Sequence, residues 1–173
     1  MDLNFIADEK LRTRIADSIK YISALLENES LFKNNESRQE TYRIVILYCV
    51  SIMEAIFLYI HHNSKDKIYK QEYKDVAELS ERYINTQWGG KVMVAVRTEM
   101  TKKELEIGFQ ELVTFYKDKM LKEDTLERIK RIAQKRNTFH FRKNGSNDCT
   151  LDDVEEALAL LNMCINNSPR FLK

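Results

Sequence analysis

The feature that most constrains the fold is a long apolar segment, residues 44–60, with the sequence IVILYCVSIMEAIFLYI. Its 17 residues carry a single charge, that of Glu54. The segment is shorter than the roughly 20 apolar residues that a membrane-spanning helix needs. A helix that is apolar on nearly all sides normally lies at the centre of a protein, with other helices around it. The sequence therefore predicts a central core helix over about residues 38–62 and no membrane segment.

The remaining pattern predicts helices around this one. The 173 residues include only one proline and four glycines, the residues that most often interrupt helices. Apolar residues recur at spacings of three and four and predict further helices. The expected ranges are 6–32, a helix opening at Thr101 and reaching Tyr116, 124–142, and a last helix from Thr150 to about Asn166. Capping boxes are expected at Ser37/Glu40, Thr101/Glu104 and Thr150/Asp153.

The middle of the chain is less helical in pattern. Residues 63–75 are predicted to be a charged connector, and residues 75–85 a short helix. Residues 91–98 alternate and are β-branched, which is typical of a short strand or one arm of a hairpin. The sequence predicts an all-α fold, a single domain over 1–173 made of five to six bundled helices, with room for this one strand or hairpin near 91–98.

Composition points to a soluble cytoplasmic protein. The chain is 43% hydrophobic and 32% charged, as in ordinary globular domains. Its three cysteines show no CxxC or Cys/His spacing, so we expect reduced thiols and neither a disulfide framework nor a structural metal. The first residues, MDLNFIADEK, lack the basic and apolar regions of a signal peptide.

Charge is concentrated in one stretch although the net charge is only +1. From 128 to 143 there are seven basic residues, one histidine and no acid; the basic residues are Arg128, Lys130, Arg131, Lys135, Arg136, Arg142 and Lys143. Such a cluster could attract phosphates, or it could be a solvated helix face. A second cluster is acidic, residues 152–156, and the N-terminal dipole of a helix is enough to explain it. The aromatic residues Tyr69 and Tyr73 could stack on bases, although packing in a core or interface is the more common role.

Two residues of this stretch fall where apolar side chains are expected. When 124–142 is projected at about 100° per residue, Arg136 and His140 lie on the apolar face, and Asn137 lies at its edge. Burying an unpaired guanidinium is very costly, so Arg136 needs an ion-pair partner, a cleft or an interface. One interpretation is a buried ion pair with Glu54. The other is phosphodiester chemistry, in which His140 moves a proton, Arg136 stabilises phosphate charge and Asn137 orients either group.

The chain resembles the HEPN family (higher eukaryotes and prokaryotes nucleotide-binding domains). The resemblance is carried by SIMEAIFLYI (51–60), by residues 111–141 and by Arg136-Asn137 followed by His140. It implies a homodimer in which two such helices meet in one composite cleft, and an activity as a metal-independent endoribonuclease. The family motif has four to six residues between arginine and histidine, and this chain has three. That spacing fits either a catalytic variant or a member that kept the dimer and the binding surface alone.

The leading hypothesis is a metal-independent endoribonuclease in phage defence or acting as a toxin, without metal or cofactor. Arg136, His140 and Asn137 would act on the phosphodiester, and Lys135, Arg131, Arg142 and Lys143 would bind RNA. Its partners would be RNA, a second copy of the chain, and an antitoxin or other regulatory protein. The alternative is a non-catalytic HEPN-type module that binds RNA, nucleotide or a partner protein. A third possibility is a structural protein in which Arg136, His140 and Glu54 form a buried polar network.

Overall fold

The chain forms two compact units. A computed structural model describes residues 2–28, 34–78, 93–117, 119, 121–139 and 148–172. The helical unit comprises residues 1–65 and 108–173, and the hairpin unit comprises residues 66–107. In the sequence, the hairpin unit is inserted between the two halves of the helical unit.

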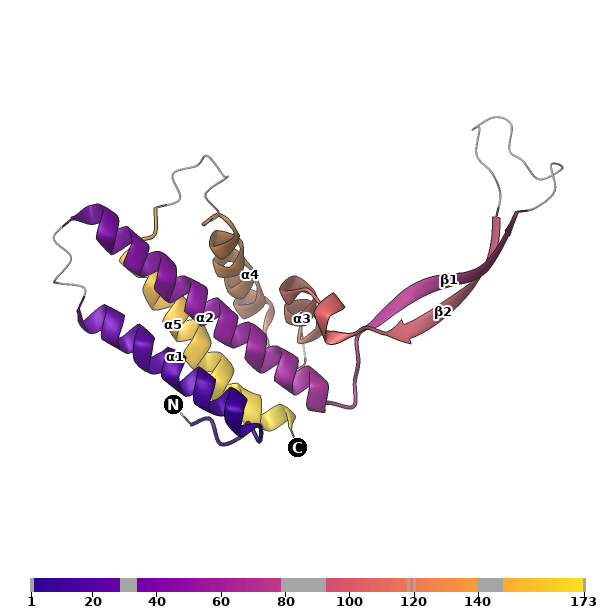
Figure 1. Cartoon of the computed structure of the whole chain (residues 1–173), viewed down its shortest axis with the longest axis horizontal. Coiled ribbons are helices and arrows are strands. Elements are labelled where there is room, and N and C mark those ends of the chain that lie inside the picture. Colours follow the sequence, from indigo (N-terminus) through magenta and orange to yellow (C-terminus); the bar gives the residue numbers. More distant parts are fainter. Residues whose placement is uncertain are drawn as a thin grey trace, which may run out of the picture. The chain divides into compact units, whose positions relative to one another are not determined.

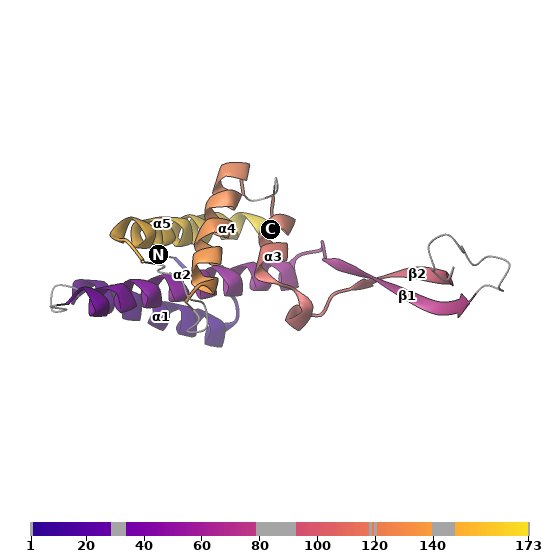
Figure 2. The ribbon, with the colours of Figure 1, turned by 90° about the horizontal axis from the view of Figure 1, so that it is seen from above.

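The helical unit contains five α-helices in the part of the chain that the structure describes. They are α1 (Glu9–Glu27), α2 (Asn35–Asn63), α3 (Phe109–Phe115), α4 (Glu123–Asn137) and α5 (Leu151–Asn167). Helices α1, α2 and α5 lie side by side, and α4 packs across α2 and α5 (Figures 1 and 2). A short 3₁₀ turn, η4 (Ser168–Phe171), follows α5. Because α2 contacts each of the other four helices, it is the central element of the unit.

The prediction of a central core helix is confirmed. The buried residues of α2 form one broad face that includes the completely inaccessible Val45, Met53 and Phe57, whereas Leu47 and Ser51 on the other side are exposed. Among the described residues, α2 is the one helix long and apolar enough to cross a membrane by length and composition. However, 56% of its most apolar window is buried against the rest of the helical unit, which accounts for its composition.

Local hydrogen bonds decide where the helices begin. The capping box at Thr150 and Asp153 is confirmed: the Thr150 hydroxyl accepts from the Asp153 N–H at 3.3 Å. The expected cap at Ser37 is wrong, because the Asn34 side chain accepts from the Ser37 N–H at 2.7 Å and α2 starts earlier. The box expected at Thr101 is also wrong, since Thr101 ends a strand.

The hairpin unit is a two-stranded antiparallel sheet of β1 (Tyr69–Glu78) and β2 (Met93–Thr101), followed by the 3₁₀ turn η3 (Glu104–Glu106) (Figure 1). The strand expected near 91–98 is confirmed over its described residues. The expected connector over 63–75 and short helix over 75–85 are wrong where they overlap β1, and residues 79–85 lie outside the described residues. Pairing with β2, a contact between segments distant in sequence, overrides the weak local pattern of β1. The fold is therefore mainly α, with a hairpin at the place where the prediction left room for one.

Candidate functional site at the end of helix α4

Helix α4 ends earlier than its pattern predicts. Its apolar face is buried as expected, including Ile129 and Ile132, but the last helical residue is Asn137. The Thr138 hydroxyl donates to the Lys135 carbonyl at 2.6 Å, and the Thr138 N–H bonds to the same oxygen at 3.0 Å. That oxygen would otherwise accept the Phe139 N–H, which instead bonds to the Arg136 carbonyl at 3.2 Å. The helix expected to reach 142 thus ends at Asn137, and the position of His140 relative to Arg136 lies outside the described residues.

Arg136 is held on three sides at this helix end. Its Nη1 lies 3.0 Å from Oε2 of Glu54 on α2, and its Nη2 lies 3.4 Å from Oδ1 of Asn137. Its guanidinium carbon stands 5.7 Å from the centre of the Phe109 ring, within the range of a cation–π contact. The side chains of Arg136 and Glu54 are 20% and 32% exposed. The ion pair expected by the structural interpretation therefore forms, although it is partly open to solvent.

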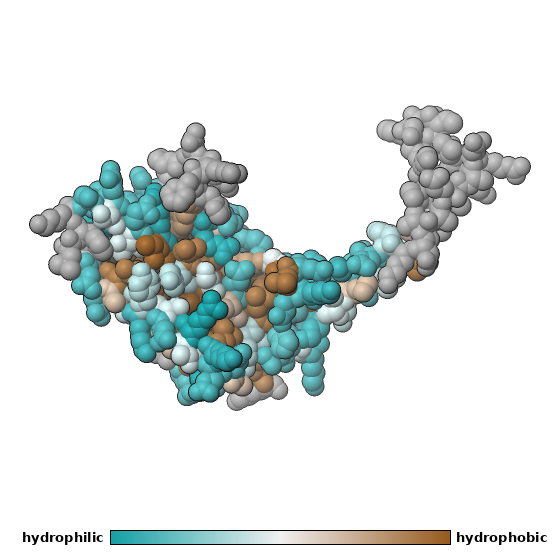
Figure 3. Space-filling view, viewed as in Figure 1, coloured by the Kyte–Doolittle hydropathy of each residue, from teal (hydrophilic) through white to brown (hydrophobic). Residues whose placement is uncertain are grey.

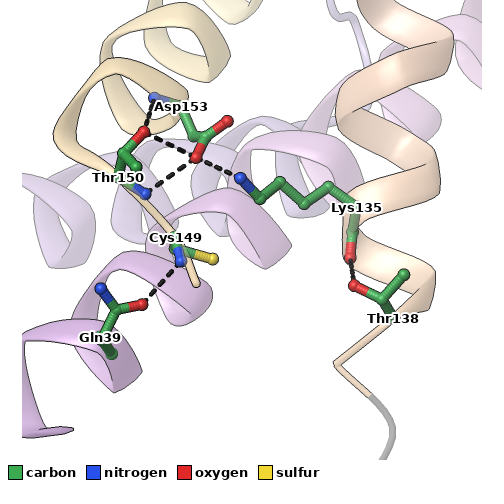
Figure 4. Close-up of polar contacts among 6 residues, drawn as sticks. All are labelled: Gln39, Lys135, Thr138, Cys149, Thr150 and Asp153. Atoms are coloured by element: carbon green, nitrogen blue, oxygen red, sulfur yellow. Dashed lines mark hydrogen bonds and ion pairs between the residues drawn. The ribbon is translucent and has the colours of Figure 1, made fainter. Parts of the chain in front are cut away.

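His140, Arg142 and Lys143 lie outside the described residues, so no geometry joins His140 to Arg136. The residues on both sides of this segment are fixed. The Cys149 N–H donates to Oε1 of Gln39 on α2 at 2.6 Å, just before α5 begins (Figure 4). Lys135, in the last turn of α4, forms an ion pair with Asp153 in the first turn of α5 (Figure 4).

The described basic residues of α4 are all paired with carboxylates. Arg128 makes two hydrogen bonds to Glu156, both 2.7 Å long, and Arg131 reaches the same carboxylate at 3.1 Å. Lys130 binds Glu127 at 3.0 Å, and Lys135 and Arg136 bind Asp153 and Glu54. The charges of the basic stretch 128–143 are thus largely neutralised in its described part, mostly by carboxylates of α5.

The pKa values of the acids on α5 reflect these pairs. Hydrogen bonds from Arg128, with help from Arg131, lower the pKa of Glu156. Partial burial alone would raise the pKa of Asp153, but hydrogen bonds from Lys135 and Thr150 lower it overall. The helix dipole was sufficient to explain these acids from sequence. Their role as partners of α4 could not be recognised, because it depends on how α5 packs against α4.

The cysteines and histidines suggest no second reactive centre. Cys49, Cys149 and Cys164 are free and buried, and burial raises the pKa of Cys49 and of Cys164 to about 12. Thiols of this kind are poor nucleophiles. His61 packs edge-on against Phe115, with ring centres 5.4 Å apart. Within the described ranges, no three histidine, cysteine or acidic side chains gather as metal ligands.

The structure has a groove between α1 and α2 that the sequence analysis does not predict. It encloses about 550 Å³, and its lining includes Leu11, Ile15, Leu47 and Ile52, with Arg14 among its polar residues. Hydrophobic residues gather on the surface over this part of α2 (Figure 3), where Leu47 is 44% exposed. The signal for it was present: α2 is apolar on more sides than its neighbours cover.

Comparison with protein-family models, characterised proteins and solved structures finds no match to this chain.

Proposed function

We propose that the chain is a HEPN-type helical domain that cleaves RNA without a metal, in the cytoplasm, as a homodimer. The observation that carries this is the setting of Arg136. Its guanidinium is fixed by Glu54, Asn137 and Phe109, and yet its side chain is 20% exposed. A charged group that is held in place and still open to solvent can bind a phosphate without first losing conformational freedom.

The proposed chemistry needs only side chains of this chain. His140 would take the proton from a ribose 2′-hydroxyl, whose oxygen then attacks the adjacent phosphorus. The bond from phosphorus to the 5′-oxygen breaks, that oxygen takes a proton from a solvent water, and His140 returns the proton it accepted to solvent. The products are a 2′,3′-cyclic phosphate and a 5′-hydroxyl. Arg136 would stabilise the charge on the phosphate oxygens, and Asn137 would orient the phosphate. Glu54 is a positioning residue, acting through Arg136.

The pairing of the other cations shapes the proposal. Arg131 and Lys135, expected to bind RNA, would have to exchange Glu156 and Asp153 for phosphates. That exchange gains little charge interaction, so we expect weak general affinity for RNA and dependence on a specific contact at Arg136. Arg142 and Lys143 complete the proposed RNA-binding set. A second copy would bring two Arg136 residues to one cleft, and a regulatory protein such as an antitoxin would restrain a toxin or defence nuclease.

The same pairing favours a second candidate function, a non-catalytic HEPN-type module that binds RNA, nucleotide or a partner protein. In that case Arg136 and Glu54 mainly join α4 to α2. A helix whose described basic residues are all matched by carboxylates exerts little long-range attraction on a polyanion.

One experiment separates the two functions. Purified protein is incubated with end-labelled RNA in EDTA, and the product ends are identified by mass. The nuclease predicts 2′,3′-cyclic phosphate ends that disappear in His140→Ala, while His62→Ala, a change of an exposed histidine on α2, keeps cleaving. Equal cleavage by wild type and His140→Ala would refute the assignment. Salt-dependent RNA binding by wild type without any cleavage would favour the module.

A further inference from the structure

The outer edge of β2 is the strongest unassigned surface of the hairpin unit. Within the described residues the sheet has two strands only, so β2 has one neighbour. An isolated two-stranded hairpin is at best marginally stable in water. The strands also expose large apolar side chains: Val96 is 58% exposed and Met100 is 38% exposed. These features suit a surface that another strand covers.

The hydrogen bonding between β1 and β2 shows which backbone groups face outward. The Lys102 N–H donates to the Ile68 carbonyl at 2.9 Å, so these two residues form a hydrogen-bonded pair. Hydrogen-bonded and non-hydrogen-bonded pairs alternate along an antiparallel ladder. The register is regular from Tyr69 opposite Thr101 to Lys74 opposite Val96. The odd-numbered residues of β2, from 95 to 101, therefore direct their N–H and C=O groups to the outer edge.

We infer that β2 pairs antiparallel with β2 of a second copy of this chain, about a two-fold axis at Thr98. In this register the outward-facing residues meet one another, and Arg97 of each copy lies opposite Glu99 of the other. On the other face, Val96 lies opposite Met100. The neighbouring two-fold registers place Arg97 opposite Arg97 or Glu99 opposite Glu99, and like charges directly opposite destabilise a sheet. Charge therefore favours this register over the neighbouring two-fold pairings of β2.

Arg97 and Glu99 form a loose ion pair within one strand, which leaves both side chains mostly exposed toward a second strand. They are 4.0 Å apart within one chain, and their side chains are 56% and 63% exposed. Across the hairpin they face Tyr73 and Gln71, which are uncharged. Neither residue thus has an opposite charge across from it until a second β2 is added.

The edge of β1 is less suited to this role. A register shift between Lys74 and Ala77 breaks its regular alternation. Bulges of this kind disrupt the row of hydrogen-bonding groups and twist the edge away from a flat partner. On β2, by contrast, residues 95–101 are centred on Thr98, and seven residues per copy could form roughly eight backbone hydrogen bonds.

Cysteine substitution in the full chain tests the position of the axis. Thr98→Cys would place two thiols opposite each other in a non-hydrogen-bonded pair, with Cβ atoms roughly 4.5–5.5 Å apart, near disulfide geometry. Val96→Cys is the matched control on the same face, because its copies would be roughly 13 Å apart. The three native cysteines are buried. We expect a disulfide-linked dimer for Thr98→Cys alone, and cross-linking of both variants, or of neither, would overturn the inference.

Charge reversal tests the register, with association measured by sedimentation at low salt. Arg97→Glu and Glu99→Arg should each weaken association roughly tenfold or more, since each replaces two opposite-charge pairs by two like-charge pairs. The double variant exchanges the charges and should restore association. A double variant as weak as the single ones, or association unchanged by all three, would contradict the inference. His140→Ala should leave this association intact, so the test is independent of the proposed nuclease.

Discussion

The ion pair between Arg136 and Glu54 should be measurable as a coupling between α4 and α2. Exposed ion pairs contribute about 0.2–1 kcal/mol, and removing one partner of a buried pair costs about 3–5 kcal/mol. With side chains 20% and 32% exposed, this pair lies between these limits and nearer the exposed case. We expect Glu54→Gln to lower the free energy of unfolding by about 1.5 kcal/mol. Arg136→Ala should cost about 2 kcal/mol, because it also removes the contact with Phe109.

Urea unfolding followed by far-ultraviolet circular dichroism measures these changes. The double variant should lose about 1 kcal/mol less free energy of unfolding than the sum of the losses in the two single variants, because the ion pair can be lost only once. Glu155→Gln, which neutralises an exposed carboxylate on α5, is the matched control and should change stability by less than about 0.5 kcal/mol. Strictly additive losses, with a coupling below about 0.3 kcal/mol, would refute the view that Glu54 holds Arg136.

Two further outcomes follow from the helix ends and the acids of α5. The pKa of Glu156 is lowered by Arg128, so its contribution to stability is complete above its usual pKa of 4.5 and is lost as the pH falls through the lower folded value. The urea midpoint for unfolding should therefore fall less steeply with decreasing pH, below about pH 5, in Glu156→Gln than in wild type. Parallel curves of midpoint against pH for the two proteins would contradict the pairing of Glu156 with Arg128. Asn34→Ala should cost about 1 kcal/mol through loss of the cap on α2, whereas Ser37→Ala, at the cap expected from sequence, should be nearly neutral in the same urea assay. Equal losses in the two variants would argue against Asn34 as the cap.

The parts of the fold that sequence predicts are those decided by local pattern. The all-round apolarity of 44–60 predicts α2 as the core helix because a segment this apolar is expected to be buried whichever neighbours cover it. The box at Thr150 and Asp153 lies within one turn of chain and is equally local. Strand β1 is different: its charged alternation resembles a connector until β2, a strand that begins only at Met93, supplies its hydrogen bonds.

The candidate site divides in the same way. The sequence identifies Arg136 as anomalous and Glu54 as its counterpart, because each stands out against an apolar background. It does not predict that α4 stops at Asn137, since the apolar spacing continues while the Thr138 hydroxyl takes the acceptor that the next turn needs. It also does not predict that Glu156 pairs with two arginines, because that contact exists only after α5 packs on α4.

The different partners of the basic residues decide which substitution can test for catalysis. Arg136 pairs with the core helix α2, whereas Arg128, Arg131 and Lys135 pair with α5. One contact therefore explains both an arginine on an apolar face and the single charge in the apolar segment 44–60 of α2. Loss of Arg136 should disturb packing and chemistry together, so an inactive Arg136→Ala would not distinguish a nuclease from a scaffold. His140 follows the end of α4 and is not needed for that contact. Loss of cleavage in His140→Ala, with the urea midpoint unchanged, is thus the result that would assign the chemistry, and retained cleavage would leave Arg136 and Glu54 as a structural pair.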